Sequence, residues 1–267
     1  MWYNGIKQFA LSIVKGEKIM SREYGLQLYS VRDLTKDDLA LAIEKVAQLG
    51  YKYVEFAGFF GHSAEEVKEM LDKNGIAVSG THSPLFDLRP SNLANVIDYH
   101  KKIGNPRYII PGCDLSTLEK IEEFAAIVNY AQPILAAEGI KLGYHNHSHE
   151  FVVMPWGSTI HSEIERRTNV EFEIDTFWTF NAGVDSIQIL ERLKNRISVI
   201  HLKDGFRAKD GQGAKGMSLG SGEAPVKAVI EAAERLGFKM VVESETLSPT
   251  GVEEVTRCID YLKSLEA

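Results

Sequence analysis

The sequence predicts a single-domain (β/α)8 TIM barrel, and three observations lead to that fold class. Eight short apolar runs of strand type alternate with amphipathic stretches of helix type along the 267 residues. Glycine follows several of the helix-type stretches, as it commonly does at a helix C-terminus. Acidic and histidine residues follow the later apolar runs, where the catalytic face of such a barrel lies. Eight units are the number that closes a parallel sheet, and such barrels routinely reach this length.

The first half of the chain contains four strand–helix units. In the first helix, Leu39, Ile43 and Val46 recur at helical spacing. A glycine follows each of the four helices, at Gly50, Gly75, Gly104 and Gly139. The predicted strands are 24–28, 52–56, 76–81 and 108–110, and the helices are 36–49, 64–74, 91–103 and 115–138.

The second half repeats this alternation and contains the two longest loops, 145–157 and 204–222. The predicted strands are 140–145, 170–174, 198–202 and 239–243, and the helices are 158–167, 186–193, 224–236 and 251–265. A doubly wound open sheet is the alternative, but it would usually show GxGxxG after its first strand, where this chain has 27–31 without a glycine. With no linker in sight, we expect one barrel over 23–267 after an N-terminal extension, 1–22, within which Met20 is an alternative start.

Composition argues against several classes of function. The formal net charge is −7 and no run of Lys and Arg is present, which argues against nucleic-acid binding. No segment approaches the roughly 20 apolar residues of a membrane span. Cys113 and Cys258 lack CxxC spacing, so a reduced, cytoplasmic protein is expected rather than a disulfide or zinc–thiolate framework. The sequence leaves the oligomeric state open, a homo-oligomer included.

Three potential metal ligands stand at the ends of consecutive predicted strands: Asp175, His201 and Glu243. Their side chains are expected at the mouth of the barrel, and carboxylates with imidazole form a metal-binding set. Each also has a structural alternative, because Asp commonly caps helices, a strand histidine is often simply buried, and a strand-end acid pairs with lysine. Glu245 would face the same way as Glu243 and competes for its role.

The fifth strand leads into the segment 144–151, which holds three histidines and a glutamate. His145 and His147 share one side of an extended segment, whereas Glu150 needs the loop to fold back. The spacing alone does not choose between these groups, and a histidine-rich surface loop is the alternative.

A metal with open positions in such a site can polarise a carbonyl and stabilise an enediolate. Carboxylates on either side of the bound carbon could then take and return a proton. Mn²⁺, Mg²⁺, Co²⁺ or Zn²⁺ would suit this mixed ligand set. The short segment 220–222, Gly-Ser-Gly, could hold a phosphate on its N–H groups or be only a turn.

At these residues the chain resembles the xylose-isomerase-like TIM-barrel superfamily, in its sugar phosphate isomerase/epimerase branch. The resemblance covers about 24–265, and its most specific segments are 144–151, 175–183, 201–204 and 242–245. It implies one divalent metal held by Glu150, Asp175, His201 and Glu243. Many members have a glutamate where this chain has His145, and His147 competes with Glu150 as the fourth ligand.

The resemblance also implies roles for further residues. Catalytic roles are expected for Glu150, Glu243, His147 and Lys203, and substrate contacts for Glu55, His82, His145 and Trp178. The alternatives are a strand-end salt bridge for Glu55, a cap for His82, and packing under the loop for Trp178. For Lys203 the alternative is pairing with Asp204.

The implied function is that of a metal-dependent sugar isomerase or epimerase acting on a small ketose or keto-sugar. An inosose-type dehydratase, a lyase with the same metal site, is the alternative. A repair endonuclease of the apurinic type is disfavoured, because that family has a zinc-binding histidine where this chain has Trp178.

Overall fold

Eight parallel strands form a closed barrel in the computed structural model, which describes residues 22–209 and 212–266. Around the barrel the order is β1-β10-β7-β6-β5-β4-β3-β2, and every neighbouring pair is parallel. The barrel strands are β1 (Tyr24–Gln27), β2 (Tyr53–Phe56), β3 (Ala77–His82), β4 (Arg107–Ile110), β5 (Lys141–His145), β6 (Glu171–Asp175), β7 (Val199–Leu202) and β10 (Lys239–Val242). The predicted (β/α)8 barrel is confirmed.

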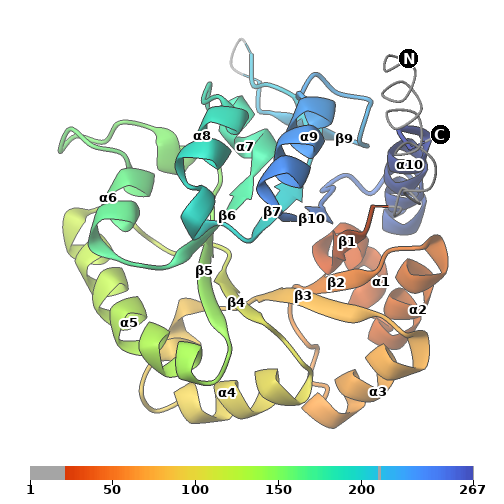
Figure 1. Ribbon diagram of the computed structural model, residues 1–267, viewed down its shortest axis with the longest axis horizontal. Helices are drawn as coiled ribbons and strands as arrows, with labels where there is room; N and C mark the ends of the chain where they lie inside the picture. The colour runs from red at the N-terminus through yellow and green to blue at the C-terminus, as the bar shows by residue number, and fades with distance from the viewer. Residues whose placement is uncertain (1–21, 210–211, 267) are drawn as a thin grey trace, which may run out of the picture.

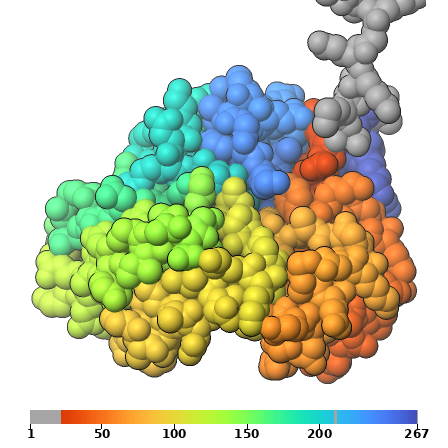
Figure 2. All heavy atoms as spheres, turned by 60° about the horizontal axis from the view of Figure 1, so that its bottom comes forward, coloured from red at the N-terminus to blue at the C-terminus, as the bar shows by residue number. Residues whose placement is uncertain are grey.

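Helices surround the barrel as an outer ring (Figure 1). They are α1 (Arg32–Thr35), α2 (Leu39–Leu49), α3 (Ala64–Asn74), α4 (Leu93–Lys102), α5 (Leu118–Ala137), α6 (Ile160–Arg167), α7 (Thr176–Asn181), α8 (Ser186–Arg192), α9 (Val226–Leu236) and α10 (Gly251–Ser264). Figure 2 shows the outside of this ring, where successive segments follow each other from orange through yellow to green. Among the described residues, no helix has the length and apolar character needed to cross a membrane.

Local sequence signals set the ends of these helices. Ser63 begins α3 with a capping box, in which its side chain accepts the N–H of Glu66 and the Glu66 carboxylate accepts the N–H of Ser63. Gly75 ends the same helix in the left-handed region, with φ of 59°. The predicted bounds of α3, 64–74, are therefore met, whereas the other elements differ by a few residues at their ends.

Apolar side chains pack on both sides of β2, one of the four strands that place an apolar residue inside the barrel. In β2, Val54 and Phe56 belong to the large core between barrel and helices, whereas Tyr53 points into the barrel. Gly25 makes room for the Tyr53 ring, since a Cβ on Gly25 would lie 2.1 Å from Cδ2 of Tyr53. Burial on both faces explains why the strand sequences are nearly continuous apolar runs.

The structure adds elements that the periodicity did not predict. Within the predicted loop 204–222, β8 (Asp204–Phe206) and β9 (Lys215–Met217) form an antiparallel hairpin. The helix α7 follows β6 directly, and four 3₁₀ helices lie in the loops, η1 (Leu28–Val31), η2 (Leu85–Leu88), η3 (His149–Phe151) and η4 (Lys194–Arg196). The predicted N-terminal extension, 1–22, lies outside the described residues except for Arg22, and Met20 lies outside them.

Candidate metal centre and active site

The barrel interior is layered, with an apolar layer beneath polar ones. The apolar layer consists of Tyr53, Ile109, Val199 and Val241. Side chains two residues apart on a strand lie on the same face of the sheet. The residues two positions after these four therefore also point inward, one layer closer to the C-terminal mouth of the barrel. Glu55, His201 and Glu243 therefore form part of the layer above, each following an apolar inward residue of its own strand.

Four potential ligands come together near the mouth: His145, Asp175, His201 and Glu243. Their donor atoms all lie within 4.8 Å of one another, and all four side chains are buried. Nδ1 of His201 lies 3.2 Å from Oε2 of Glu243. The structure thus brings together three of the four predicted metal ligands and adds His145.

Asp175 shows that this group has free donor capacity. Its Oδ1 accepts the N–H groups of Phe177 and Trp178, which begin α7, so the residue is both a helix cap and a group member. Its Oδ2 is buried and has no hydrogen-bond partner. A carboxylate oxygen without a hydrogen bond, beside buried imidazole, is the donor chemistry that a divalent transition metal takes, so the residues fit such an ion.

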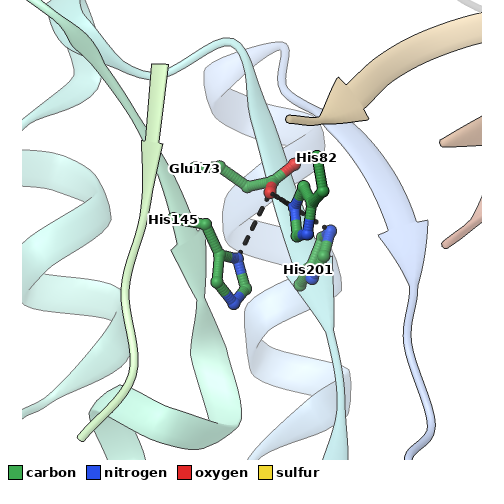
Figure 3. Close-up of side chains that lie close together, drawn as sticks. All are labelled: His82, His145, Glu173 and His201. Carbon is green, nitrogen blue, oxygen red and sulfur yellow. Dashed lines mark hydrogen bonds and ion pairs between the residues drawn. The ribbon is translucent and has the colours of Figure 1, made fainter. Parts of the chain in front are cut away.

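A second set of side chains supports the histidines from beneath. Nε2 of His82 lies 2.7 Å and Nδ1 of His145 lies 3.2 Å from Oε2 of Glu173, and Figure 3 shows these three side chains together. Nε2 of His201 lies 2.6 Å from Oε2 of Glu55. Carboxylates that hold the far nitrogen of a metal-binding histidine fix the orientation of its ring and raise its basicity.

Burial and charge shift the protonation of these groups in opposite directions. Burial lowers the pKa of His145 to about 3, so this imidazole is neutral. Burial also disfavours the charged form of His201, but Glu173 and Glu55 outweigh it and raise the pKa of His201 well above its usual value. Burial raises the pKa of Asp175 to about 6, against the lowering effect of Lys203.

Lys203 is a buried cation beside the group. Its Nζ lies 3.3 Å from Oε2 of Glu243, pairs with Glu245, and lies 4.6 Å from the centre of the Trp178 ring. Burial raises the pKa of Glu243, but Lys203 and His201 outweigh it and hold this pKa well below its usual range. Glu243 is therefore ionised at neutral pH, as a proton acceptor must be.

A cavity of about 640 Å³ opens above the group. Five predicted site residues line it: His82, His145, His147, Trp178 and Glu243. Its other lining residues are Tyr29, Ala57, Gly58, Ser83, Pro84, Pro111, Gly112 and Glu245. Another hollow, of about 670 Å³ beside α6 and α8, contains none of the predicted site residues.

Glu150 lies elsewhere than the resemblance implied. Its Oε1 accepts the hydroxyl of Tyr144 at 2.9 Å and its Oε2 accepts the N–H of His147 at 2.8 Å. Tyr144 packs against Phe124 of α5, on the side of β5 opposite to His145, because successive side chains of a strand alternate. Glu150 consequently groups with His147 and His149, and the structure does not bring it to the Asp175 group.

Glu55 also differs from its expected place. It was expected to contact substrate, but it is fully buried, does not line the cavity and accepts hydrogen bonds from His201 and Gln27. Burial, and then Glu173, raise the pKa of Glu55.

Sequence reasoning missed Glu173 and Gln27. The two-residue strand period was the available signal for Glu173, because it lies two residues before Asp175 in β6. Gln27 stands at the end of β1, where an amide gave no metal signal.

The Gly-Ser-Gly segment is already occupied by a carboxylate of the chain. Oδ2 of Asp204 accepts the N–H groups of Gly220 and Gly222, and Oδ1 accepts that of Ala224. A Cβ at Gly222 would lie 2.2 Å from Oδ1 of Asp204, so glycine is required for this close approach.

Comparison with known proteins assigns most of the chain to a family. Residues 43–265 match the family described as xylose isomerase-like TIM barrel. The chain belongs to that family. No curated protein matches the sequence.

Solved structures show the same xylose isomerase-like barrel at low sequence identity. A sugar phosphate isomerase/epimerase from Parabacteroides distasonis is 23% identical with a TM-score of 0.75, covering 93% of this chain and 96% of that one. The IOLI protein with a zinc atom is 14% identical with a TM-score of 0.69, covering 90% and 96%. The probable 3-DHS dehydratase AsbF from Bacillus anthracis is 10% identical with a TM-score of 0.70, covering 90% and 98%.

Proposed function

We propose that the protein is a divalent-metal-dependent isomerase or epimerase that moves a proton next to the carbonyl of a small sugar or sugar derivative. One observation carries the proposal. His145 and Glu243 belong to the four-ligand group and also line the 640 Å³ cavity, so a molecule in the cavity would meet whatever the group holds. His145, Asp175, His201 and Glu243 are the proposed ligands, with His145 in place of Glu150.

The bound ion would supply Lewis-acid polarisation of a carbonyl oxygen. The chain's own residues would handle the proton. Glu243 is ionised and lines the cavity, which suits it to take a proton from carbon. The buried ammonium of Lys203 lies 3.3 Å from Glu243 and would favour the charged form of that carboxylate throughout the reaction.

His147 is the proposed partner in proton transfer. It lines the cavity and its side chain is 36% exposed, so it can exchange protons with solvent. β10 and β5 are separated by β7 and β6 around the barrel, so Glu243 and His147 approach the cavity from different sides. Two proton carriers on different sides permit removal from one face of a carbon and return to the other, as epimerisation requires.

The cavity favours a substrate without a phosphate group. Its lining, as far as the chain is described, includes neither arginine nor lysine, and Lys203 is already paired with three carboxylates, those of Asp175, Glu243 and Glu245. The Gly-Ser-Gly amides are taken by Asp204. Tyr29, Pro84 and Trp178 offer instead apolar faces against which a sugar ring can pack.

The test is conversion of unphosphorylated keto-sugars and inososes in D₂O by the metal-loaded protein. Proton transfer predicts that solvent deuterium enters the product at the carbon next to the carbonyl. Conversion without deuterium incorporation would refute it. A product lighter by one water would replace isomerisation with the dehydratase alternative. Failure of the wild-type protein to bind any divalent ion would refute the metal centre, and so would unchanged binding by an Asp175→Asn variant.

A further inference from the structure

The proposed ligand group contains two imidazoles, those of His145 and His201, and two carboxylates, those of Asp175 and Glu243. We infer that His145 determines metal selectivity: it biases the centre towards zinc and cobalt and against manganese and magnesium. The inference rests on the proposed metal centre, and it concerns which ion that centre selects.

Donor chemistry provides the first argument. Imidazole nitrogen suits zinc and other later transition metals, whereas carboxylate and water oxygen suit magnesium and manganese. Imidazole binds a metal in its neutral form, so Asp175 and Glu243 would give the set two negative charges, which match one divalent cation. A glutamate at 145 would add a third negative charge and a third oxygen donor, which favours hard ions.

The rigidity of the ring provides the second argument. His145 is 2% exposed, and its ring centre lies 4.8 Å from that of His201 and 4.9 Å from that of His82. Its Nδ1 lies 3.2 Å from Oε2 of Glu173, which leaves Nε2 available as a donor. Figure 3 shows the two side chains facing each other. A ring held in this way presents its nitrogen without first losing rotamer freedom.

The two histidines of the group are supported in parallel ways. Oε2 of Glu173 lies 3.2 Å from Nδ1 of His145, and Oε2 of Glu55 lies 2.6 Å from Nε2 of His201, so each imidazole has a buried carboxylate beside it. Glu173 also lies 3.3 Å from Nε2 of His201. Those carboxylates come from β6 and β2, elements other than the strands that carry the histidines. Such paired support is expected around nitrogen ligands, and it would serve no purpose for a glutamate at position 145.

The experiment measures the dissociation constant for Mn²⁺ divided by that for Zn²⁺. A ratio is needed because most sites bind zinc more tightly than manganese in absolute terms. Chelator-stripped protein is titrated with each ion in competition with a chromophoric chelator. The variants are His145→Glu and, as the matched control with the same substitution two residues away, His147→Glu. We expect His145→Glu to lower the ratio about tenfold or more, and His147→Glu to leave it within about twofold, since one donor of four changes only in the first.

Several outcomes overturn the inference. It is wrong if folded His145→Glu has the wild-type ratio, or if His147→Glu shifts the ratio instead. If circular dichroism shows that His145→Glu does not fold, His145→Gln takes its place. This variant must raise the dissociation constant for Zn²⁺ about tenfold and change that for Mn²⁺ less than threefold. No metal binding by the wild type refutes both proposals. A shifted ratio without any sugar conversion supports the selectivity and refutes the proposed reaction.

Discussion

His161 forms the middle of a stack of three rings that anchors the segment after β5. Its ring centre lies 4.8 Å from Phe151, the last residue of η3, and 4.4 Å from Phe172 of β6. Burial lowers the pKa of His161 to about 4, below the ordinary value of about 6.5. The unfolded chain therefore binds a proton before the folded chain does. The resulting stability is fully present above pH 6.5 and is lost as the pH falls towards 4.

The magnitude follows from the pKa difference. A shift of 2.5 units corresponds to about 3 kcal/mol in full, and about 2 kcal/mol of it is lost at pH 5, which lies 1.5 units below the unfolded pKa. A phenylalanine keeps the stack and removes the titration. We therefore expect the loss of unfolding free energy between pH 7.5 and pH 5 to be about 2 kcal/mol smaller in His161→Phe than in wild type.

Urea unfolding followed by circular dichroism at the two pH values measures this difference. The values at pH 7.5 serve as the baseline, because any packing cost of the larger ring is present at both pH values and cancels. His100, whose pKa burial also lowers to about 4, keeps its own share of the pH dependence in both proteins. Equal losses in wild type and variant would refute the assignment of a neutral, buried His161.

Three further changes test the site and its supports. Glu243→Gln should reduce sugar conversion about a hundredfold or more without changing the circular dichroism spectrum, because the proposed proton acceptor is gone; retained turnover would exclude that role. Lys203→Met should lower the free energy of unfolding in urea by about 3–5 kcal/mol, because it leaves buried carboxylates without their cation. Gly222→Ala should cost about 1–3 kcal/mol through its clash with Asp204, whereas Gly213→Ala, which has open space, should change the same measurement little.

The barrel could be predicted because its signals are local. Apolar strand runs, helical spacing and terminal glycines each depend on a few neighbouring residues, and α3 shows how closely such signals set an element. The hairpin of β8 and β9 gave no such signal, since its strands are three residues each and contain Gly205 and Gly216. Its position depends instead on Asp204, which binds backbone N–H groups 16 to 20 residues away.

The site was only partly predictable, and strand alternation explains which part. Asp175 and His201 stand at strand ends on the inward side, so the rule that chemistry follows strands was sufficient for them. Glu150 lies in η3, where its position depends on the long-range fold of the loop and on Tyr144. A sequence pattern contains no information on that fold, and only the resemblance favoured Glu150 over His145 and His147.

The two-residue period of β6 would have predicted one more residue of the site, Glu173, than the family resemblance did. Because Asp175 faces inward, the residue two positions earlier, Glu173, must face inward as well, at a level where the barrel is closed to water. A buried carboxylate requires charged or hydrogen-bonded partners. The strand-end histidines His82, His145 and His201 are the groups that inward-facing neighbours could supply, and all three lie within 2.7 to 3.3 Å of the Glu173 carboxylate. The acid beneath the candidate ligands was thus implied by the sequence, and it is the residue that orients His145 in the proposed centre.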